Sequence, residues 1–371
     1  MAKQIGLICE PSPIVELDLL AIHASRQEAP ASSQIPAKSS PFFDIRETSH
    51  AGRGAFAKQN IASETCIFEA ASPFVSIVYK PFRKEACNFC FHYDNGRKMK
   101  IAFIAGEGKT ARGLAWFCSE ECKEHWVANM GKVGIDALRS ISAALLKSQK
   151  AGSVGDDVHK QITPSCIVEA WRKASESPPQ GVRLIHEEDD EDTLAYLLNG
   201  MIAHFNSKAA WHDFLSLAPS LQPYLNHSPN LASHIRLYDF LRLHLPKPML
   251  SSCEPEIVVD LVTRDRGNSF GIFELDLPDG EMLGYGTWVA ASFFNHSCRP
   301  NLSKKTSGRA LHFYTLREAK EGDELCISYI GDAKSMSLRE RRKRLQAGWS
   351  FICQCEWCSE EEGRMETNQA E

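Results

Sequence analysis

Hydrophobic and polar positions alternate over short runs in both halves of the chain, and this period-two pattern predicts β-strands. The glycine-rich turn SHAGRG (49–54) separates the first run from the second. The runs are FFDIRE (42–47), GAFA (54–57), TCIFEA (65–70), PFVSIVY (73–79), SFGIFELDL (269–277), ALHFYTL (310–316) and DELCISYI (323–330).

The middle of the chain has a different period. Apolar residues recur at helical spacing in GIDALRSISAALLKSQ (134–149) and in TLAYLLNGMIAHF (193–205). The acidic run HEEDDEDT (186–193) predicts a solvated loop or a helix start, and PSLQPYLNHSPN (219–230) predicts a loop. SLRERRKRLQ (337–346) predicts a charged helix. Strands therefore precede and follow a helical middle, which indicates an α+β fold.

Composition and charge narrow the class of protein. The 371 residues are 43% hydrophobic and 24% charged with a formal net charge of −5, typical of a soluble globular protein with one large domain carrying insertions, or with two domains. The mild acidity argues against a general nucleic-acid binder. We see no signal peptide and no apolar stretch of membrane-spanning length, so we expect an intracellular protein without a membrane segment.

Thirteen cysteines are many for this length, and intracellular cysteines that cluster favour metal binding over disulfides. The first cluster consists of two close pairs whose four thiolates suit a tetrahedral structural zinc. Buried free thiols are the alternative, and His92 and His125 are rival ligands. The predicted ligands are Cys87, Cys90, Cys118 and Cys122.

The second cluster, CQCEWC, has three cysteines in six residues and needs a fourth ligand from elsewhere. Cys298, in the polar heptapeptide NHSCRPN (295–301), is the candidate, although it could equally be a small buried apolar residue. The predicted second set is Cys298, Cys353, Cys355 and Cys358. We expect the scattered cysteines to be core or surface thiols: Cys9, Cys66, Cys166, Cys253 and Cys326.

Five segments, taken in this order, resemble the SET-domain protein lysine methyltransferases from about residue 42 to residue 360. They are AGRGAFA (51–57), NSFGI (268–272), NHSCRPN (295–301), GDELCISYI (322–330) and CQCEWC (353–358). The split by a cysteine-bearing insert resembles the SET–MYND branch. The insert shows the ligands of one zinc where a full MYND module binds two, and no helical repeat domain follows the tail. The layout is thus similar to the shorter fungal SET–MYND-type proteins.

The resemblance implies a domain plan. A flexible arm (1–41) rich in Pro, Ser and Ala near its end precedes the first part of the SET domain (42–86), a reduced MYND-like zinc insert (87–130) and a helical insert (131–260). The second part of the SET domain (261–335) follows, and then a helix, a zinc tail and a disordered end (336–371). The family fold also implies a pseudoknot, in which the segment carrying Tyr329 passes beneath the NHSC loop, with the apolar ASFF (291–294) as a core strand.

The resemblance also implies residue roles around S-adenosylmethionine. Tyr329 is the expected catalytic residue, whose hydroxyl orients the transferred methyl group; otherwise it is a packed strand tyrosine. Asn295 and His296 are expected to hold the cofactor, although a lone histidine in such a place is more often a satisfied core residue. The remaining predicted cofactor contacts are Arg53 and Gly54 at a tight turn, Asn268 and Ser269, and Phe351, which otherwise packs against the tail.

The implied activity is S-adenosylmethionine-dependent methylation of a lysine in a histone or another basic protein, with two structural zinc ions. We expect a monomer in the nucleus, the cytoplasm or both, with no sequence-specific nucleic-acid partner. The basic run RERRKR (339–344) is either a nuclear-localisation signal or the basic helix that the family carries there. The alternative function is that of a catalytically weak interaction protein that kept the SET frame.

Overall fold

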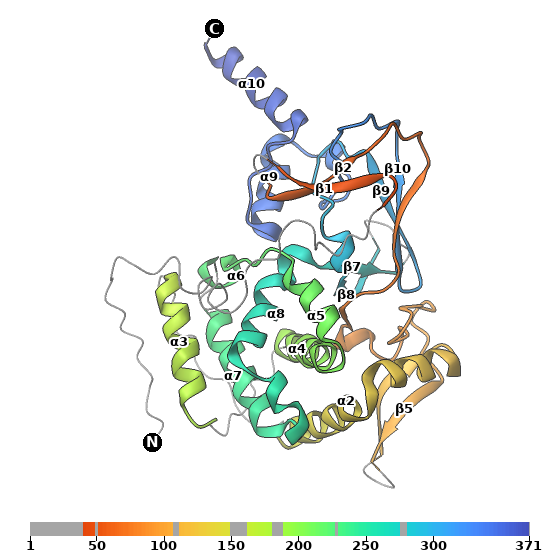
Figure 1. Cartoon of the computed structure of the whole chain (residues 1–371), viewed down its shortest axis with the longest axis vertical. Helices are drawn as coiled ribbons and strands as arrows, with labels where there is room; N and C mark the ends of the chain where they lie inside the picture. Colours follow the sequence, from red (N-terminus) through yellow and green to blue (C-terminus); the bar gives the residue numbers. More distant parts are fainter. Residues whose placement is uncertain are drawn as a thin grey trace.

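The structure is a computed structural model that describes residues 40–48, 51–106, 111–148, 162–179, 188–226, 229–274 and 280–370. The predicted arm (1–41) therefore lies almost entirely outside the described residues. Most strands lie in the upper part of Figure 1, together with α9, and most helices lie in the lower part, together with β5, while α10 projects from the top. This mixed helix and sheet architecture confirms the α+β class.

Strands from the first half of the chain pair with strands from the second half. In one sheet, β3 (Cys66–Ala70) and β9 (Leu302–Ser307) flank β10 (Ala310–Thr315). In another, β4 (Val75–Val78) and β7 (Phe270–Phe273) flank β8 (Met282–Thr287), and every pairing is antiparallel. A third sheet pairs β1 (Phe43–Glu47) with β2 (Arg53–Ala57). The sheet core therefore needs strands from both halves of the described chain.

The cysteine-bearing insert forms a small module between these two halves. Its hairpin consists of β5 (Ile101–Ala105) and β6 (Arg112–Phe117), which pack on the first turns of α2 (Glu120–Ser148). Arg309, at the turn between β9 and β10, lies 4.6 Å over the ring of Phe89 and donates to the Phe89 carbonyl at 2.8 Å. This contact connects the module to the SET sheet.

The helical insert has its own large core around α4 (Glu188–Asn206). The buried stripe of α4 includes Leu194, Leu197 and Met201, which recur at helical spacing as predicted. α2 bends at Gly131, whose φ of 66° favours glycine. The other helices are α3 (Pro164–Glu176), α5 (Lys208–Leu215), α6 (Gln222–Asn226), α7 (Pro229–His244), α8 (Pro255–Asn268) and the 3-10 turns η2 (Lys80–Phe82) and η4 (Lys247–Ser252).

Three local expectations were wrong and a fourth was right in part, and long-range contacts explain most of the differences. DELCISYI is no regular strand: Glu324 and Ile327 form only isolated bridges. ASFF follows the 3-10 turn η5 (Val289–Ala291) as a buried turn. The acidic run begins α4 as one alternative proposed, but Asp192 is buried against Arg83 at 2.8 Å and is not solvated. The expected loop at 219–230 contains α6 and the start of α7.

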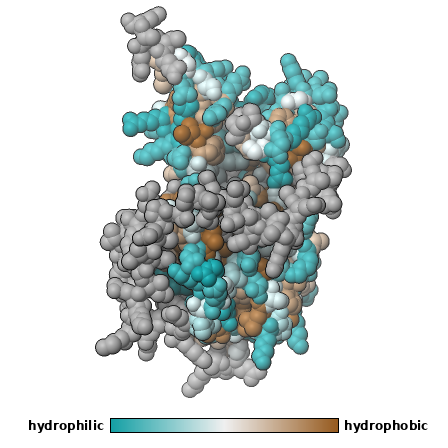
Figure 2. Space-filling model, turned by 60° about the vertical axis from the view of Figure 1, so that its left-hand side comes forward, coloured by the Kyte–Doolittle hydropathy of each residue, from teal (hydrophilic) through white to brown (hydrophobic). Residues whose placement is uncertain are grey.

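The C-terminal part carries the predicted charged helix. α9 (Leu338–Trp349) starts with a capping box, in which Ser337 and Glu340 satisfy each other's backbone N–H groups. The 3-10 turn η6 (Ala333–Ser335) precedes it and α10 (Glu356–Ala370) follows it. The described residues on the face in Figure 2 are mainly hydrophilic, with separate small hydrophobic areas. No helix among the described residues is long and apolar enough to cross a membrane.

Candidate cofactor site and cysteine clusters

The segment 292–296 brings together most of the predicted site residues. The Ser292 hydroxyl donates to the Asn268 carbonyl at 2.8 Å, and the Arg53 guanidinium lies 5.1 Å over the Phe293 ring. The Asn295 amide donates to the Arg53 carbonyl at 3.1 Å. Residues 242 positions apart in sequence thus meet at one place because β2, α8 and the NHSC loop converge there.

Asn295 is held by a carboxylate that sequence reasoning missed. Its amide also donates to the Glu324 Oε1 atom at 2.8 Å. Gly54 leaves the room for this contact: a Cβ atom there would lie 2.5 Å from that Glu324 oxygen and 2.8 Å from the Asn295 nitrogen. Glu324 stands in the expected strand DELCISYI, and its only sequence signal is a carboxylate inside an otherwise apolar run.

Gly54→Ala is expected to weaken cofactor binding about tenfold, because the added methyl group displaces a charge-assisted hydrogen bond. Calorimetric titration with S-adenosylhomocysteine measures this. Gly52→Ala is the matched control: Gly52 has a φ of +70° and no atom within 4 Å of the added Cβ. That control should lose about 1 kcal/mol of stability through backbone strain while binding normally. Equal binding by both variants would contradict the role given to Gly54.

His296 is a satisfied histidine that connects two parts of the site. Its Nδ1 atom accepts from the Tyr329 backbone N–H at 3.0 Å, and its Nε2 atom lies 3.3 Å from the Cys298 sulfur. Burial lowers the pKa of His296 to about 4, so the ring is neutral and its Nε2–H donates to the sulfur. The ring therefore ties the Tyr329 segment to the second cysteine cluster.

The backbone of His296 faces the other way. It forms a parallel bridge with Ile327, in which the Asn295 carbonyl and the Ser297 amide are the bonded groups. The N–H and C=O of His296 make no hydrogen bond to another described residue. Because neighbouring backbone groups of an extended segment point in opposite directions, this donor and acceptor remain for a ligand. The bridge is also the contact by which the Tyr329 segment lies against the NHSC loop, as the pseudoknot requires.

Tyr329 is partly buried beside the loop with its hydroxyl fixed. The hydroxyl donates to the Phe294 carbonyl at 3.0 Å, and burial raises the pKa of Tyr329 above its usual range. Trp349 and Phe351 are its aromatic neighbours, with ring centroids 5.3 and 6.4 Å away. Phe351 also lies 6.2 Å from the His296 ring, and Trp349 was not predicted from the sequence. The geometry keeps a neutral phenol with its oxygen lone pairs available.

Asn268 and Ser269 point in different directions. The Asn268 amide donates to the Ala218 carbonyl at 3.1 Å, towards the helical insert. The Ser269 hydroxyl lies 2.8 Å from both Asp265 and Thr287, in a network that continues to Tyr285. The Ser269 side chain therefore contacts this network and not Arg53 or Asn295.

Asp265 should make stability depend on pH. Burial raises the pKa of its carboxyl to about 6, although Ser269 and Tyr285 donate hydrogen bonds to it. A raised folded-state pKa contributes stability below the unfolded pKa of about 3.9, and this contribution is lost as the pH rises through 6. Asp265→Asn removes the titration, so the variant should gain up to about 3 kcal/mol relative to wild type between pH 4 and 7. Urea unfolding of both proteins across this range tests the expectation, and a constant difference would refute it.

The first cysteine cluster has the shape of a tetrahedral metal site. The Sγ atoms of Cys87, Cys90, Cys118 and Cys122 all lie within 4.8 Å of one another, with Cys90–Cys118 at 3.5 Å and Cys118–Cys122 at 3.6 Å. Four sulfurs at about 2.3 Å from a zinc ion lie about 3.8 Å apart, so the donor set fits. Neither predicted rival belongs to the group: His125 stacks on Phe89.

The second cluster joins the NHSC loop to the tail. Cys298 lies 3.9 Å from Cys353 and 3.6 Å from Cys358, and the four sulfurs, that of Cys355 included, are again within 4.8 Å of one another. The spacing rules left Cys298 undecided, and the structure places it in the set. Outside both sets, Cys253 and Cys326 are buried and Cys66 is exposed, while Cys9 lies outside the described residues.

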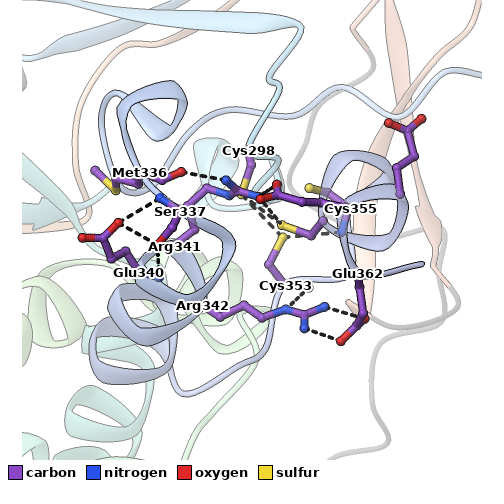
Figure 3. Close-up of polar contacts among 12 residues, drawn as sticks. Cys298, Met336, Ser337, Glu340, Arg341, Arg342, Cys353, Cys355 and Glu362 are labelled. Atoms are coloured by element: carbon purple, nitrogen blue, oxygen red, sulfur yellow. Dashed lines mark hydrogen bonds and ion pairs between the residues drawn. The ribbon is translucent and has the colours of Figure 1, made fainter. Parts of the chain in front are cut away.

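A buried arginine faces the second cluster. Arg341 is 1% exposed, and its guanidinium lies 3.7 Å from the Cys358 sulfur and 3.9 Å over the Trp357 ring. Figure 3 shows this side chain pointing from α9 into the cysteine group, while Arg342 pairs with Glu362 on α10. Two arginines of the basic run RERRKR therefore make contacts within the C-terminal tail. The Arg341 guanidinium also pairs with the Glu361 carboxylate at 2.6 Å, so its charge is shared between the cysteine group and α10.

Comparison with known proteins agrees with this geometry. The family described as "SET domain" matches residues 159–330. The "Potential protein lysine methyltransferase SET6" of Saccharomyces cerevisiae is 24% identical, covering 87% of this chain and 96% of that protein. The "Histone-lysine N-methyltransferase SET5" of Eremothecium gossypii is 26% identical over 42% of this chain and 38% of its own length. A SET and MYND domain-containing protein of Dictyostelium discoideum is 38% identical over 28% of this chain and 20% of its own.

The chain thus carries a SET domain in residues 159–330. Its SET domain also needs the strands before residue 159, because β3 pairs with β10 and β4 pairs with β8. The inserts between them leave the SET strands adjacent in space (Figure 1). The names of these relatives thus agree with the family that the sequence motifs resemble.

Proposed function

We propose that this protein is a protein-lysine N-methyltransferase that uses S-adenosylmethionine. The observation that carries the proposal is the hydroxyl of the partly buried Tyr329, which is neutral and fixed by the Phe294 carbonyl next to Asn295 and His296. The relative named as a potential lysine methyltransferase aligns with this chain over 96% of its own length. Together these support methyl transfer over a purely structural use of the SET frame.

The chemistry that S-adenosylmethionine supplies is a methyl group on a sulfonium, which is a good leaving group. The protein then has to bind, align and exclude water. The Tyr329 hydroxyl donates a hydrogen bond to the Phe294 carbonyl. Its oxygen lone pairs can therefore accept weak C–H···O contacts from a methyl group. His296 offers a free backbone donor and acceptor, and Arg53 offers a cation for a carboxylate.

The acceptor amine has to be neutral when it attacks. A lysine with a free pKa of about 10.4 loses its proton more readily in a desolvated channel beside a cationic group. The rings of Tyr329, Trp349 and Phe351 supply such an apolar surface. Tyr329 itself stays protonated because burial raises its pKa, so it acts as a positioning hydroxyl and not as a base.

We further propose that each cysteine cluster holds one structural zinc ion. The Cys298 cluster would fix the NHSC loop to the tail and the Cys87 cluster would stabilise the MYND-like insert. We propose a lysine in a histone or another basic protein as substrate, a monomeric state, and the nucleus, the cytoplasm or both as the location. A histone-lysine methyltransferase name on a partial relative supports the substrate class.

The test uses purified protein, radiolabelled S-adenosylmethionine and two acceptors, core histones and a total protein extract. Label on a protein band, located on lysine by mass spectrometry, is the expected result. Binding of S-adenosylhomocysteine without transfer to either acceptor would support the alternative, a catalytically weak interaction protein. A protein that neither binds S-adenosylhomocysteine nor transfers methyl groups would refute the proposed function.

A further inference from the structure

Four consecutive backbone carbonyls, those of residues 215–218, accept hydrogen bonds from side chains on other elements. We call this stretch the 215–218 loop; it follows directly from the end of α5. Arg264 donates to the first carbonyl at 3.4 Å and to the third at 2.9 Å. Arg53 donates to the second, and Asn268 donates to the fourth at 3.1 Å. Two of these three donors are predicted cofactor contacts.

The chemistry of a helix end explains why cations gather there. Leu215 is the last residue of α5 and Ser216 is its C-cap, so their carbonyls have no partner within the helix, and the carbonyls of residues 217 and 218 lie just beyond it. Ser216 is 9% exposed and Leu217 is 2% exposed, so water has little access to the middle of the loop, whereas Ala218 at its end is exposed. Side chains therefore have to satisfy the carbonyls of Ser216 and Leu217, and the guanidinium groups of Arg53 and Arg264 do so.

Arg264 is built into the fold more firmly than the other two donors. It is 7% exposed, and its Nη1 atom lies 2.5 Å from the Asp260 carboxylate one turn earlier on α8. This ion pair fixes the plane of the guanidinium, so its remaining N–H groups reach two carbonyls of the loop at once. A lysine ammonium could keep the contact with Asp260 but could not also donate to both carbonyls of the loop.

We propose that Arg264 is a positioning residue for cofactor binding, acting through the 215–218 loop on Arg53 and Asn268. The Arg53 guanidinium lies between a carbonyl of the loop and the Phe293 ring, and its own carbonyl accepts from Asn295. If the loop shifts, Arg53 and Asn268 lose their fixed acceptors, and ordering them again upon binding costs affinity. The helical insert thus forms one wall of the site. This inference rests on the proposed function.

Arg264→Lys is the test variant. Its affinity for S-adenosylhomocysteine, measured by calorimetry, is expected to fall about tenfold. In methyl-transfer assays the KM for S-adenosylmethionine should rise by a similar factor, while the KM for the protein acceptor stays within about twofold. A general loss of structure would change both KM values and lower Tm, so this split distinguishes positioning from folding.

Arg242→Lys is the matched control. Arg242 on α7 also pairs with an aspartate, Asp239, and donates to two backbone carbonyls, those of Ala174 and Ser177. These contacts hold α3 against α7 and involve none of the predicted cofactor contacts. The control should lose a comparable amount of stability and bind S-adenosylhomocysteine as the wild type does.

Hydrogen–deuterium exchange of the wild-type protein gives a second test that does not depend on a variant folding. Binding of S-adenosylhomocysteine should slow amide exchange in residues 213–220. Unchanged exchange there, or equal affinity of wild type and Arg264→Lys, would overturn the inference and leave the proposed function standing. A wild type that neither binds S-adenosylhomocysteine nor transfers methyl groups would overturn both.

Discussion

Tyr329→Phe should lower the rate of methyl transfer about 100-fold while leaving affinity for S-adenosylhomocysteine within a few-fold of wild type. The substitution removes only the oxygen that lies 3.0 Å from the Phe294 carbonyl. The ring stays, so its contacts with Trp349 and Phe351 remain and the aromatic surface is unchanged. The variant loses the hydroxyl oxygen that we propose accepts weak C–H···O contacts from the transferred methyl group.

A second tyrosine provides the control. Tyr224 is 1% exposed, and its hydroxyl lies 3.0 Å from the His234 Nδ1 atom inside the helical insert. Tyr224→Phe also removes a buried hydroxyl, so both variants should lose about 1 kcal/mol of stability by urea unfolding. Only Tyr329→Phe should lose methyl transfer. Comparable rates for Tyr329→Phe and wild type would show that the hydroxyl is not the catalytic group.

The parts of the fold that sequence patterns predicted are those with local causes. The period-two runs became β1, β2, β3, β4, β7 and β10, and the helical runs became parts of α2, α4 and α9. Each of these elements buries one face against a core, which is what periodicity records. The α+β class and the positions of both cysteine clusters were also predictable, because close cysteine pairs are a local signal.

The parts that failed depend on distant partners. Ile327 donates to the Asn295 carbonyl across the pseudoknot, so the segment around Tyr329 finds its hydrogen bonds in a loop and not in a neighbouring strand. Asp192 is buried because Arg83, 109 positions earlier, pairs with it. No local pattern encodes such a partner, and acidic runs are usually solvated.

The same limit applies to the site. Arg53, Asn295 and Tyr329 could be proposed because short motifs mark them, and the structure brings these residues together without testing what they bind. Glu324 and Arg264 could not be proposed, since each acts through a backbone or side-chain contact far away in sequence. Residues that support a motif from outside it become visible only when the fold is known.

Cys298→Ser is expected to remove one of two zinc ions per chain and to weaken cofactor binding by more than tenfold, with a matching loss of methyl transfer. A serine hydroxyl is a poor replacement for a thiolate ligand, and metal binding by such a site is coupled to folding. The tail has a small core, which includes Ile330, Leu338 and Leu345 beside the cysteines. Without the metal this core offers little burial to hold α9 and the NHSC loop together.

The loss should reach the cofactor site because of where Cys298 lies. Its sulfur is 3.3 Å from the His296 ring, and that ring accepts from the Tyr329 backbone at 3.0 Å. Phe351 stands two residues before the ligand Cys353. If the tail detaches, Phe351 leaves the site and His296 no longer fixes the Tyr329 segment. We therefore expect affinity for S-adenosylhomocysteine to fall by more than tenfold.

Two comparison variants separate metal loss from cysteine loss. Cys253→Ala removes a buried thiol outside both clusters and should keep two zinc ions and full binding. Cys90→Ser should lose one zinc ion from the first cluster yet bind S-adenosylhomocysteine within about threefold of wild type, because the contacts of that module with Arg309 and Trp288 involve none of the predicted cofactor contacts. Elemental analysis of zinc per chain and calorimetry of each variant provide the measurements.

If Cys298→Ser retained two zinc ions, Cys298 would not be a ligand. If it lost one ion but bound normally, the tail metal would stabilise the fold without shaping the site.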